Sequence, residues 1–254
     1  MIVSQRELIM QPNLLILGGT NEATSLAKII AKHQIKAIVS YAGRVERIAE
    51  LPVPKRIGGF GGVDGLKAYI RAEQITHIID ATHPFAAEMS WNAAHACKAL
   101  NIPLLALTRP AWQAQPGDRW QYVPDMDGAV RALDGDARRV MLAIGRMHLA
   151  AFTTHQQHFY LLRLVDPPEI APAFRDYHTI ISRGPFTTED DVKLLKTHEI
   201  DVIIAKNAGG RGAVAKIDAA RALGIDVIMI DRPELPERAE CQTVEDVLMW
   251  LHNH

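Results

Sequence analysis

The chain has 254 residues, of which 48% are hydrophobic and 22% charged, and its formal net charge at pH 7 is −1. This length holds one large domain or two small ones, and the balanced charge argues against a nucleic-acid or membrane-surface partner. The two cysteines, Cys97 and Cys241, lie far apart without C-x-x-C spacing, which argues against a disulfide framework or zinc cluster and fits a reducing cytoplasm. No apolar run reaches the roughly 18 residues of a membrane span, and residues 1–11 lack the apolar core of a signal peptide.

Strands and helices alternate along the first half of the sequence. Apolar runs predict strands at residues 14–17, 37–40, 77–80 and 103–107, and the segments between them predict helices at 21–33, 64–72 and 84–100. Pro84 would lie in the first turn of the last helix, where a missing N–H costs little. Such nearly continuous apolar strands indicate a parallel sheet covered on both faces, which binds ligands beyond the carboxyl ends of its strands.

The alternation of strands and helices stops at residues 109–127, which are rich in proline and aromatic side chains. This composition predicts a crossover out of the first half, and a helix predicted at 126–133 ends that half. The pattern then restarts, with strands predicted at 140–144, 159–163, 179–182, 201–205 and 226–230, and helices after Thr187 or Thr188, at 213–223 and at 244–252. Thr108-Arg109-Pro110 and Asp231-Arg232-Pro233 follow corresponding strands of the two halves. We therefore expect an α/β fold of two Rossmann-like lobes, residues 12–134 and 135–254, each a parallel sheet with helices on both faces, with a ligand cleft between them.

The first strand ends in Gly18-Gly19-Thr20, and a helix follows. This order places backbone N–H groups and the positive end of a helix where a phosphate can bind. The spacing is not G-x-G-x-x-G, although Ala23 is tolerated at its last position. An ordinary turn that needs glycine at positive φ explains the pattern equally well.

The second strand ends in Ser40-Tyr41-Ala42-Gly43-Arg44. An NAD site would have Asp or Glu near this point to bind the ribose hydroxyls. Ser40 and Arg44 suit a 2′-phosphate instead, because a guanidinium binds phosphate bidentately. The sequence thus favours NADP over NAD, and the alternative is that Arg44 is a solvated surface residue.

Asp80-Ala81-Thr82-His83-Pro84 places an acid, a hydroxyl and an imidazole after the third predicted strand. His83 could act as a general acid near neutral pH. Thr82 or His83 could instead cap the following helix.

Two loops of the second half, Ser182–Phe186 and Lys206–Gly210, combine glycine with Arg, Lys or Asn and suit carboxylates or phosphates. Gly209-Gly210-Arg211-Gly212 is a second possible anion-binding turn, although a plain turn explains each loop alone. Lys206 does not belong to a Walker motif, and no serine lies in a G-x-S-x-G elbow. The histidines lack a third ligand at metal spacing, so no metal site is predicted.

Taken in this order, the motifs resemble those of the precorrin-6A reductase family, including its cobalt-precorrin-6A form. The resemblance extends over nearly the whole chain after residue 12, and its motifs are Ile16-Leu17-Gly18-Gly19-Thr20-x-Glu22-Ala23, Ser40-x-Ala42-Gly43-Arg44, Asp80-Ala81-Thr82-His83-Pro84-Phe85-Ala86, Arg183-Gly184-Pro185-Phe186 and Lys206-Asn207-x-Gly209-Gly210. One position departs from the family: Ala208 stands where Ser or a similar polar residue is usual, so a hydroxyl contact is missing there.

The resemblance implies an N-terminal NADP-binding lobe and a C-terminal lobe that contributes to a tetrapyrrole site. It implies that NADPH reduces one carbon–carbon double bond of precorrin-6A, or of its cobalt form, to give precorrin-6B in cobalamin biosynthesis. His83 is the expected proton donor, with solvent as the alternative. The cofactor-binding residues expected are Gly18, Gly19, Thr20, Glu22, Ser40, Gly43, Arg44, Asp80 and Thr82. The substrate-binding residues expected are Arg183, Gly184, Pro185, Phe186, Lys206, Asn207, Gly209 and Gly210.

Two other functions stay open: an NADP-sensing module without catalysis, and a reductase of another polycarboxylate. A sensor has no need for cations in the second half, and the predicted loops hold or adjoin several, namely Arg146, Arg163, Arg183, Lys206 and Arg211. These cations match a substrate with several carboxylates and favour the enzyme. Nothing in the sequence suggests an obligate oligomer, so we expect a cytoplasmic monomer.

Overall fold

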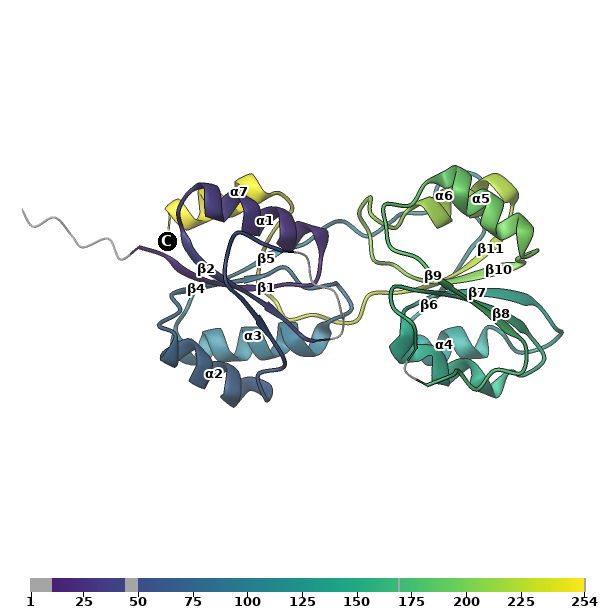
Figure 1. The fold of residues 1–254 in the computed structure, drawn as a ribbon, viewed down its shortest axis with the longest axis horizontal. Coiled ribbons are helices and arrows are strands. Elements are labelled where there is room, and N and C mark those ends of the chain that lie inside the picture. Colours follow the sequence, from purple (N-terminus) through teal and green to yellow (C-terminus); the bar gives the residue numbers. More distant parts are fainter. Residues whose placement is uncertain (1–10, 44–49, 169, 254) are drawn as a thin grey trace, which may run out of the picture. The chain divides into compact units, whose positions relative to one another are not determined.

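The computed structural model describes residues 11–43, 50–168 and 170–253. The chain forms two compact units (Figure 1), each built on a six-stranded sheet. Unit 1 comprises Met1–Thr108 and Leu235–His254, and unit 2 comprises Arg109–Glu234.

Every pair of neighbouring strands in unit 1 is parallel, in the order β12-β5-β4-β1-β2-β3. The strands are β1 (Asn13–Leu17), β2 (Lys36–Tyr41), β3 (Lys55–Ile57), β4 (His77–Asp80), β5 (Leu104–Leu107) and β12 (Ala239–Cys241). Helices α1 (Asn21–Lys32) and α7 (Val244–His252) cover one face, and α2 (Gly62–Ala72) and α3 (Ala87–Leu100) cover the other (Figure 1). Three central strands, β1, β2 and β4, therefore end side by side at one edge.

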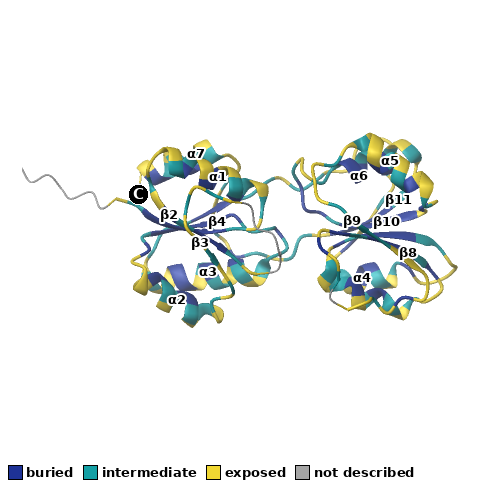
Figure 2. Cartoon of the chain, viewed as in Figure 1, coloured by how far each residue is buried: buried dark blue, intermediate teal, exposed yellow. Residues whose placement is uncertain are grey.

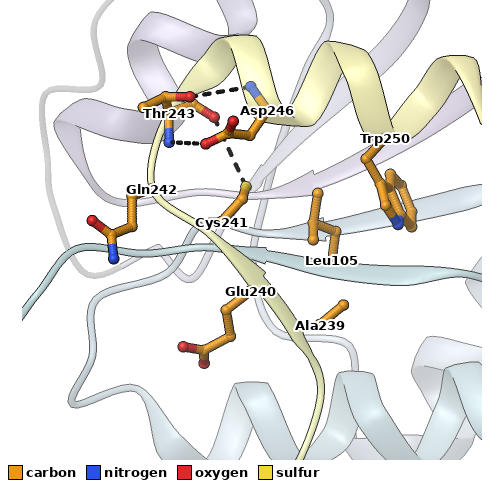
Figure 3. Close-up of a pocket in the computed structure, with 8 residues that line it drawn as sticks. All are labelled: Leu105, Ala239, Glu240, Cys241, Gln242, Thr243, Asp246 and Trp250. Atoms are coloured by element: carbon orange, nitrogen blue, oxygen red, sulfur yellow. Dashed lines mark hydrogen bonds between the residues drawn. The ribbon is translucent and has the colours of Figure 1, made fainter.

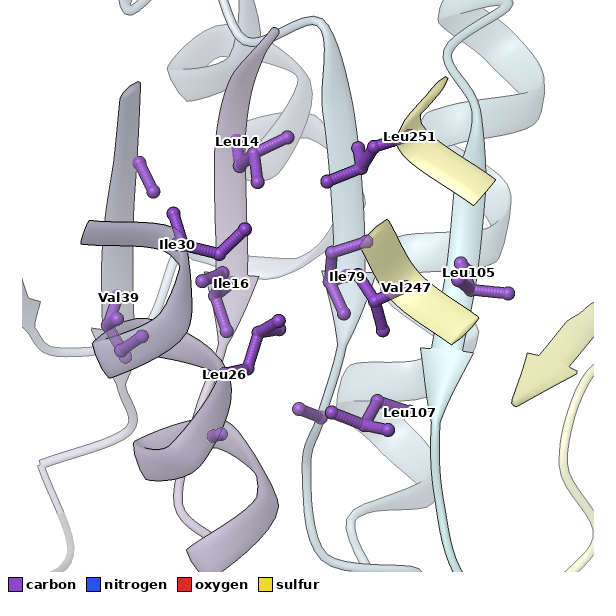
Figure 4. Packing of buried hydrophobic residues seen from close by; sticks show 14 residues of the cluster. Leu14, Ile16, Leu26, Ile30, Val39, Ile79, Leu105, Leu107, Val247 and Leu251 are labelled. Carbon is purple, nitrogen blue, oxygen red and sulfur yellow. The ribbon is translucent and has the colours of Figure 1, made fainter. Parts of the chain in front are cut away.

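The core of unit 1 follows from the two-residue period of a strand. All five residues of β1 are buried. Leu14 and Ile16 pack with the α1 and α7 side chains (Figure 4), whereas Leu15 and Leu17 pack with α2 and α3. Each such side chain contributes about 1.5–3 kcal/mol when fully buried, so β1 holds both layers of helices to the sheet.

Unit 2 repeats this architecture, with parallel strands in the order β6-β11-β10-β7-β8-β9. The strands are β6 (Trp120–Val123), β7 (Arg139–Ala143), β8 (Phe159–Leu164), β9 (Tyr177–Ile181), β10 (Val202–Lys206) and β11 (Asp226–Ile230). Helices α5 (Thr188–Thr197) and α6 (Ala215–Leu223) cover one face, and α4 (Met126–Arg131) covers the other, where it contacts the 3₁₀ helix η1 (Arg146–Thr154). The inner strands β7, β10 and β11 are buried almost throughout, while the helices expose their outer faces (Figure 2).

The predicted α/β fold of two Rossmann-like lobes is confirmed: both sheets are parallel, with helices on both faces. The predicted boundary at residues 134 and 135 differs from the observed units. Strand β6 pairs with β11 in unit 2, and β12 returns to pair with β5 in unit 1, followed by α7. The first crossing, at Arg109, lies at the start of the crossover predicted over residues 109–127. Apolar periodicity identifies strands but not the sheet that each one joins, so the return of the chain to unit 1 at Leu235 was not predicted.

The helix predicted from residue 84 begins instead at Ala87. The N–H of Ala86 donates to the His83 carbonyl (2.7 Å), and the N–H of Phe85 donates to His83 Nδ1 (3.2 Å). These bonds form a turn before the helix. Of the two residues predicted to precede the helix after β9, Thr187 is the N-cap of α5, and Thr243 is the N-cap of α7; each hydroxyl accepts a bond from the first turn of its helix. Among the residues described, no helix has the length and apolar character needed to cross a membrane.

His158 in unit 2 gives the fold a pH dependence. Its ring is buried; Nδ1 accepts from the Arg138 N–H (3.0 Å), and Nε2 lies 2.8 Å from the Leu133 carbonyl. These two contacts require a neutral ring that donates from Nε2 and accepts at Nδ1. Burial lowers the pKa of His158 from its ordinary value. Because the folded state then binds this proton less readily than the unfolded chain, stability falls as the pH drops below about 6.5.

We expect His158→Gln to weaken this pH dependence, because the amide of Gln supplies one donor and one acceptor but does not titrate. The measurement is the unfolding temperature of the wild type and the variant between neutral and mildly acidic pH. Gln157→Ala, at the exposed neighbouring position, is the control. Identical pH profiles for wild type and His158→Gln would contradict this role.

Candidate functional site at the carboxyl edges of the two sheets

The turn between β1 and α1 has the geometry of a phosphate cradle. Gly19 adopts φ +123°, and among the described residues nothing apart from its chain neighbours lies within 4 Å of the position that a Cβ would take there. The Thr20 hydroxyl caps α1 by accepting from the Ala23 N–H (3.1 Å), and Glu22 lies in the first helical turn. The turn thus combines open space with the positive end of a 12-residue helix.

Backbone contacts tie this turn to the ends of the neighbouring strands. The Gly18 N–H donates to the Ser40 carbonyl at the end of β2 (2.8 Å). On the other side, the Thr20 hydroxyl donates to the Ala81 carbonyl just beyond β4 (2.8 Å). The structure therefore brings together predicted cofactor residues from three separate segments at one edge of the unit 1 sheet.

Ser40 has a cationic neighbour that the sequence analysis missed. Its buried hydroxyl accepts from Arg56 Nη1 (2.9 Å), and the same guanidinium donates to the carbonyls of Gly58 (2.7 Å) and Gly59 (3.1 Å). The Arg56 guanidinium carbon also lies 3.9 Å from the centre of the Phe60 ring. The predicted Arg44 lies outside the described residues, and Gly43 follows β2 at φ +78°. A positive charge thus stands beside Ser40 at the predicted ribose end.

The loop after β4 is organised by Asp80. Its carboxylate accepts from the N–H (3.1 Å) and the hydroxyl (2.7 Å) of Thr82 and from the Ser90 hydroxyl (2.6 Å). It also forms an ion pair with Arg238 (2.5 Å). All of these contacts come from the protein, so the structural role of the Asp80 carboxylate is to hold the loop.

His83 follows this anchored segment. Because the Phe85 N–H donates to Nδ1 (3.2 Å), a neutral His83 ring carries its proton on Nε2. The ring is partly exposed, as proton exchange with a ligand requires. Neither Thr82 nor His83 is the helix N-cap, which is Ala86.

In unit 2, the loop after β10 is fastened by its own side chain and by Trp112. Asn207 is 5% exposed; its Oδ1 accepts from the Trp112 N–H (2.8 Å), and its Nδ2 donates to the Trp112 carbonyl (3.1 Å). The Trp112 indole N–H donates to the Gly210 carbonyl (2.8 Å). Both ends of the Asn207 side-chain amide, which was predicted to bind substrate, thus bond the Trp112 backbone and shape the loop.

Two arginines bind the remaining carbonyls of this loop. Arg109 Nε donates to the carbonyls of Ala208 (3.0 Å) and Gly209 (3.3 Å). Arg232 donates to the carbonyls of Asn207 (3.0 Å) and Ala208 (3.1 Å). The repeated Arg-Pro pairs were visible in the sequence, but nothing there indicated that both would converge on one loop.

The second predicted substrate loop follows β9. Arg183 forms an ion pair with Asp166, and a Cβ placed on Gly184 would lie 3.7 Å from the Gly212 carbonyl oxygen. Gly184 thus lies near Gly212, two residues beyond the Lys206–Gly210 loop, although β7 and β8 separate β9 from β10 in the sheet.

Charged side chains in the interior of unit 2 lie against these loops. Arg163, predicted as a cation near the cleft, forms an ion pair with the buried Asp191 (2.7 Å) and lies 3.9 Å from the centre of the Phe186 ring. Lys216 is also buried, and its ammonium lies 4.9 Å from the centre of the Trp112 ring. Burial, together with the Arg163 charge, lowers the pKa of Lys216 to about 8. Arg163 therefore braces the Phe186 loop from inside the unit.

An open groove of about 600 Å³ lies elsewhere in unit 1, along β12 and the start of α7 (Figure 3). It contains none of the predicted site residues. Burial raises the pKa of the Cys241 thiol on its wall to about 11, so this cysteine stays protonated at neutral pH. The predicted motifs lie in the strand-end loops, which therefore remain the candidate site.

Comparisons with known proteins cover both units. A family model described as precorrin-6x reductase CbiJ/CobK matches residues 13–252. The chain is 53% identical over 241 residues to the precorrin-6A reductase of Rhodobacter capsulatus, covering 95% of this chain and 96% of that protein. It is 44% identical over 246 residues to a precorrin-6A reductase from Sinorhizobium sp, covering 95% of this chain and 94% of that protein. A solved structure named CobK precorrin-6A reductase matches with a TM-score of 0.92 at 52% identity, covering 96% of this chain and 97% of that one.

Proposed function

Because this chain belongs to the precorrin-6x reductase CbiJ/CobK family, we propose that it reduces one carbon–carbon double bond of precorrin-6A with NADPH. The product is precorrin-6B, an intermediate on the way to cobalamin. The family places the chain among the oxidoreductases that act on a CH–CH group. Precorrin-6A without cobalt is the proposed substrate, because both relatives described above carry that name. We place the reaction in the cytoplasm, since Cys97 and Cys241 are free thiols.

The observation that carries this proposal is the β1–α1 turn of unit 1, which is hydrogen-bonded to the carboxyl ends of β2 and β4. Gly19 leaves open space in front of the α1 N-terminus, and Gly18 and Thr20 fix the turn to both neighbouring strands. These residues fit a pyrophosphate, which binds well to the N–H groups at a helix start. When bound there, NADPH supplies the hydride. Ser40, Gly43 and Arg44 would hold the ribose end, and Thr82 the part nearer the reacting edge.

The substrate is a macrocycle with several carboxylates, and unit 2 offers groups that suit them. The carbonyls of the Asn207–Gly210 loop are occupied by Arg109, Trp112 and Arg232. Within the described residues, the N–H groups of Gly209 and Gly210 donate to no backbone acceptor. A loop with occupied carbonyls and available N–H groups suits an anion. Lys206 and Arg183 would add positive charge, and Gly184, Pro185 and Phe186 would line the apolar ring.

His83 is the proposed proton donor to the reduced bond. In the neutral ring, Nδ1 accepts from the Phe85 N–H and Nε2 carries the hydrogen. The form that donates a proton is the imidazolium, which carries a hydrogen on both nitrogens, so taking up the proton would release the Phe85 bond. We propose that His83, Arg183 and Lys206 face one ligand cleft, because each follows a strand end where such sheets bind ligands. Solvent is the alternative source of the proton.

The cofactor assignment predicts a preference that can be measured. Arg44→Ala should weaken NADPH binding by about 1–3 kcal/mol through the loss of charge-assisted hydrogen bonds to the 2′-phosphate. NADH binding should barely change. Titrations of both cofactors against the wild type and the variant give the answer, with Lys55→Ala as a control that removes an exposed cation at the start of β3. Equal losses for NADPH and NADH would show that Arg44 does not read the 2′-phosphate.

The function itself is tested by mixing purified protein with NADPH and precorrin-6A and following the loss of NADPH absorbance. We expect oxidation of NADPH that depends on precorrin-6A, and a slower reaction with NADH. The same assay with the cobalt-containing substrate distinguishes the two forms of the family.

A further inference from the structure

The carboxylate of Asp80 is held by donors from three segments of unit 1. Asp80 ends β4 and is 2% exposed. Its Oδ1 accepts both bonds from Thr82, and its Oδ2 accepts from Ser90 on α3 (2.6 Å) and from Arg238 Nη1 (2.5 Å). Removing any of these donors would leave part of a buried carboxylate without a partner.

Arg238 is the charged member of this set. Its side chain is 6% exposed, and it lies just after the chain re-enters unit 1 at Leu235 and before β12 begins. A buried carboxylate that loses its cationic partner keeps the full cost of its desolvation, because neutral donors replace the lost water only in part. The burial of the Asp80 carboxylate as an ion therefore depends on a cation 158 positions away in the sequence.

This carboxylate fixes the residue immediately before His83. Thr82 gives Asp80 both its N–H (3.1 Å) and its hydroxyl (2.7 Å). Beyond His83, the bonds from Phe85 and Ala86 close the turn. Hydrogen bonds thus fix the backbone on both sides of His83. On the Thr82 side, these bonds are made to the Asp80 carboxylate.

We propose that Arg238 is a positioning residue, which acts through Asp80 and Thr82 to hold His83 at the site of reduction. The inference rests on the proposed function, in which His83 donates the proton. Loss of the Arg238 charge would leave Asp80 buried among neutral donors, and the Thr82 turn would shift to bring the carboxylate to water. Displacement of a catalytic group by about 1 Å can lower a rate by about a hundredfold.

Three variants separate this role from a general effect of losing an arginine. Arg238→Met removes the charge and keeps an extended apolar chain, and Arg238→Lys restores the charge with a single ammonium. Arg71→Met makes the same change at an exposed arginine in the last turn of α2, away from the Asp80 contacts.

The first readout is amide hydrogen exchange by mass spectrometry on the full chain without ligands. Peptides that cover residues 80–86 should exchange faster in Arg238→Met, return toward wild-type rates in Arg238→Lys and stay unchanged in Arg71→Met. Wild-type exchange in Arg238→Met would overturn the proposal, whatever the activity of the protein.

The second readout is a double-mutant cycle with His83→Ala. Arg238→Met should lower kcat by about ten- to a hundredfold and change KM for NADPH much less. In the His83→Ala background, the same change should lower kcat no further, because both changes remove one contribution. If the double variant lost kcat by the product of the two single losses, the proposal would be overturned. Full activity in Arg238→Met would also overturn it. If the wild type does not reduce precorrin-6A, the proposed function fails, and the exchange experiment alone decides whether Arg238 holds the loop.

Discussion

His83→Ala is expected to lower kcat for precorrin-6A reduction by about 10²–10⁴-fold, the usual contribution of a general acid. The affinities for NADPH and substrate should change far less, since the ring is proposed to act on the reacting bond. The ring is partly exposed, and as the imidazolium it would carry an acidic hydrogen on Nε2. The measurement is steady-state kcat and KM for both ligands.

His83→Asn separates proton transfer from loop structure. The Asn oxygen can accept the Phe85 N–H in place of Nδ1, yet the amide carries no proton that it can donate as an acid. We therefore expect His83→Asn to keep the wild-type unfolding temperature and to share the low kcat of His83→Ala. His95→Ala, at an exposed histidine of α3, is the matched control. Full turnover in His83→Asn would assign proton transfer to solvent.

Gly209→Ala is expected to disrupt the proposed substrate loop. Gly209 adopts φ +68°, and a Cβ there would lie 2.0 Å from the Pro110 carbonyl oxygen and 2.5 Å from Arg232 Nη2. Both neighbours would have to move, which adds about 1–3 kcal/mol of overpacking to the backbone strain of an L-residue. We expect a lower unfolding temperature and a KM for precorrin-6A that rises at least tenfold, with little change in NADPH affinity.

Gly224→Ala supplies a matched control for Gly209→Ala. Gly224 caps α6 at φ +65°, and apart from its chain neighbours no part of the described chain lies within 4 Å of the position of its added Cβ. This variant therefore carries the backbone strain alone, about 1–2 kcal/mol, and should keep its KM for substrate. If the two variants had equal KM values, the packing of Arg232 and Pro110 against the loop would have no part in substrate binding.

The fold was predictable where strands are buried on both faces. The strands at residues 77–80 and 226–230 and the last helix at 244–252 were predicted with their observed bounds, because their apolar patterns are strong local signals. The missed strands β3, β6 and β12 lie at sheet edges and contain exposed residues. An edge strand need not be apolar, so periodicity does not reveal it.

The loops of the candidate site were predictable from the sequence, but the hydrogen bonds and ion pairs that hold them in place were not. Gly18 to Thr20, Asp80 to His83 and Lys206 to Gly210 were located because each follows an apolar strand. The arginines that hold these loops, Arg56, Arg109, Arg232 and Arg238, were not assigned to them. Most of their contacts join residues far apart in the sequence, and pairing of that kind depends on the folded chain.

The most direct test of the proposed reaction uses NADPH deuterated at the transferable position, with mass spectrometry of the tetrapyrrole product. We predict that wild-type protein forms precorrin-6B with one deuterium from the cofactor, and that a second hydrogen comes from water when the reaction runs in D₂O. Binding of NADPH without any deuterium transfer to precorrin-6A would contradict the reductase and favour an NADP-sensing module.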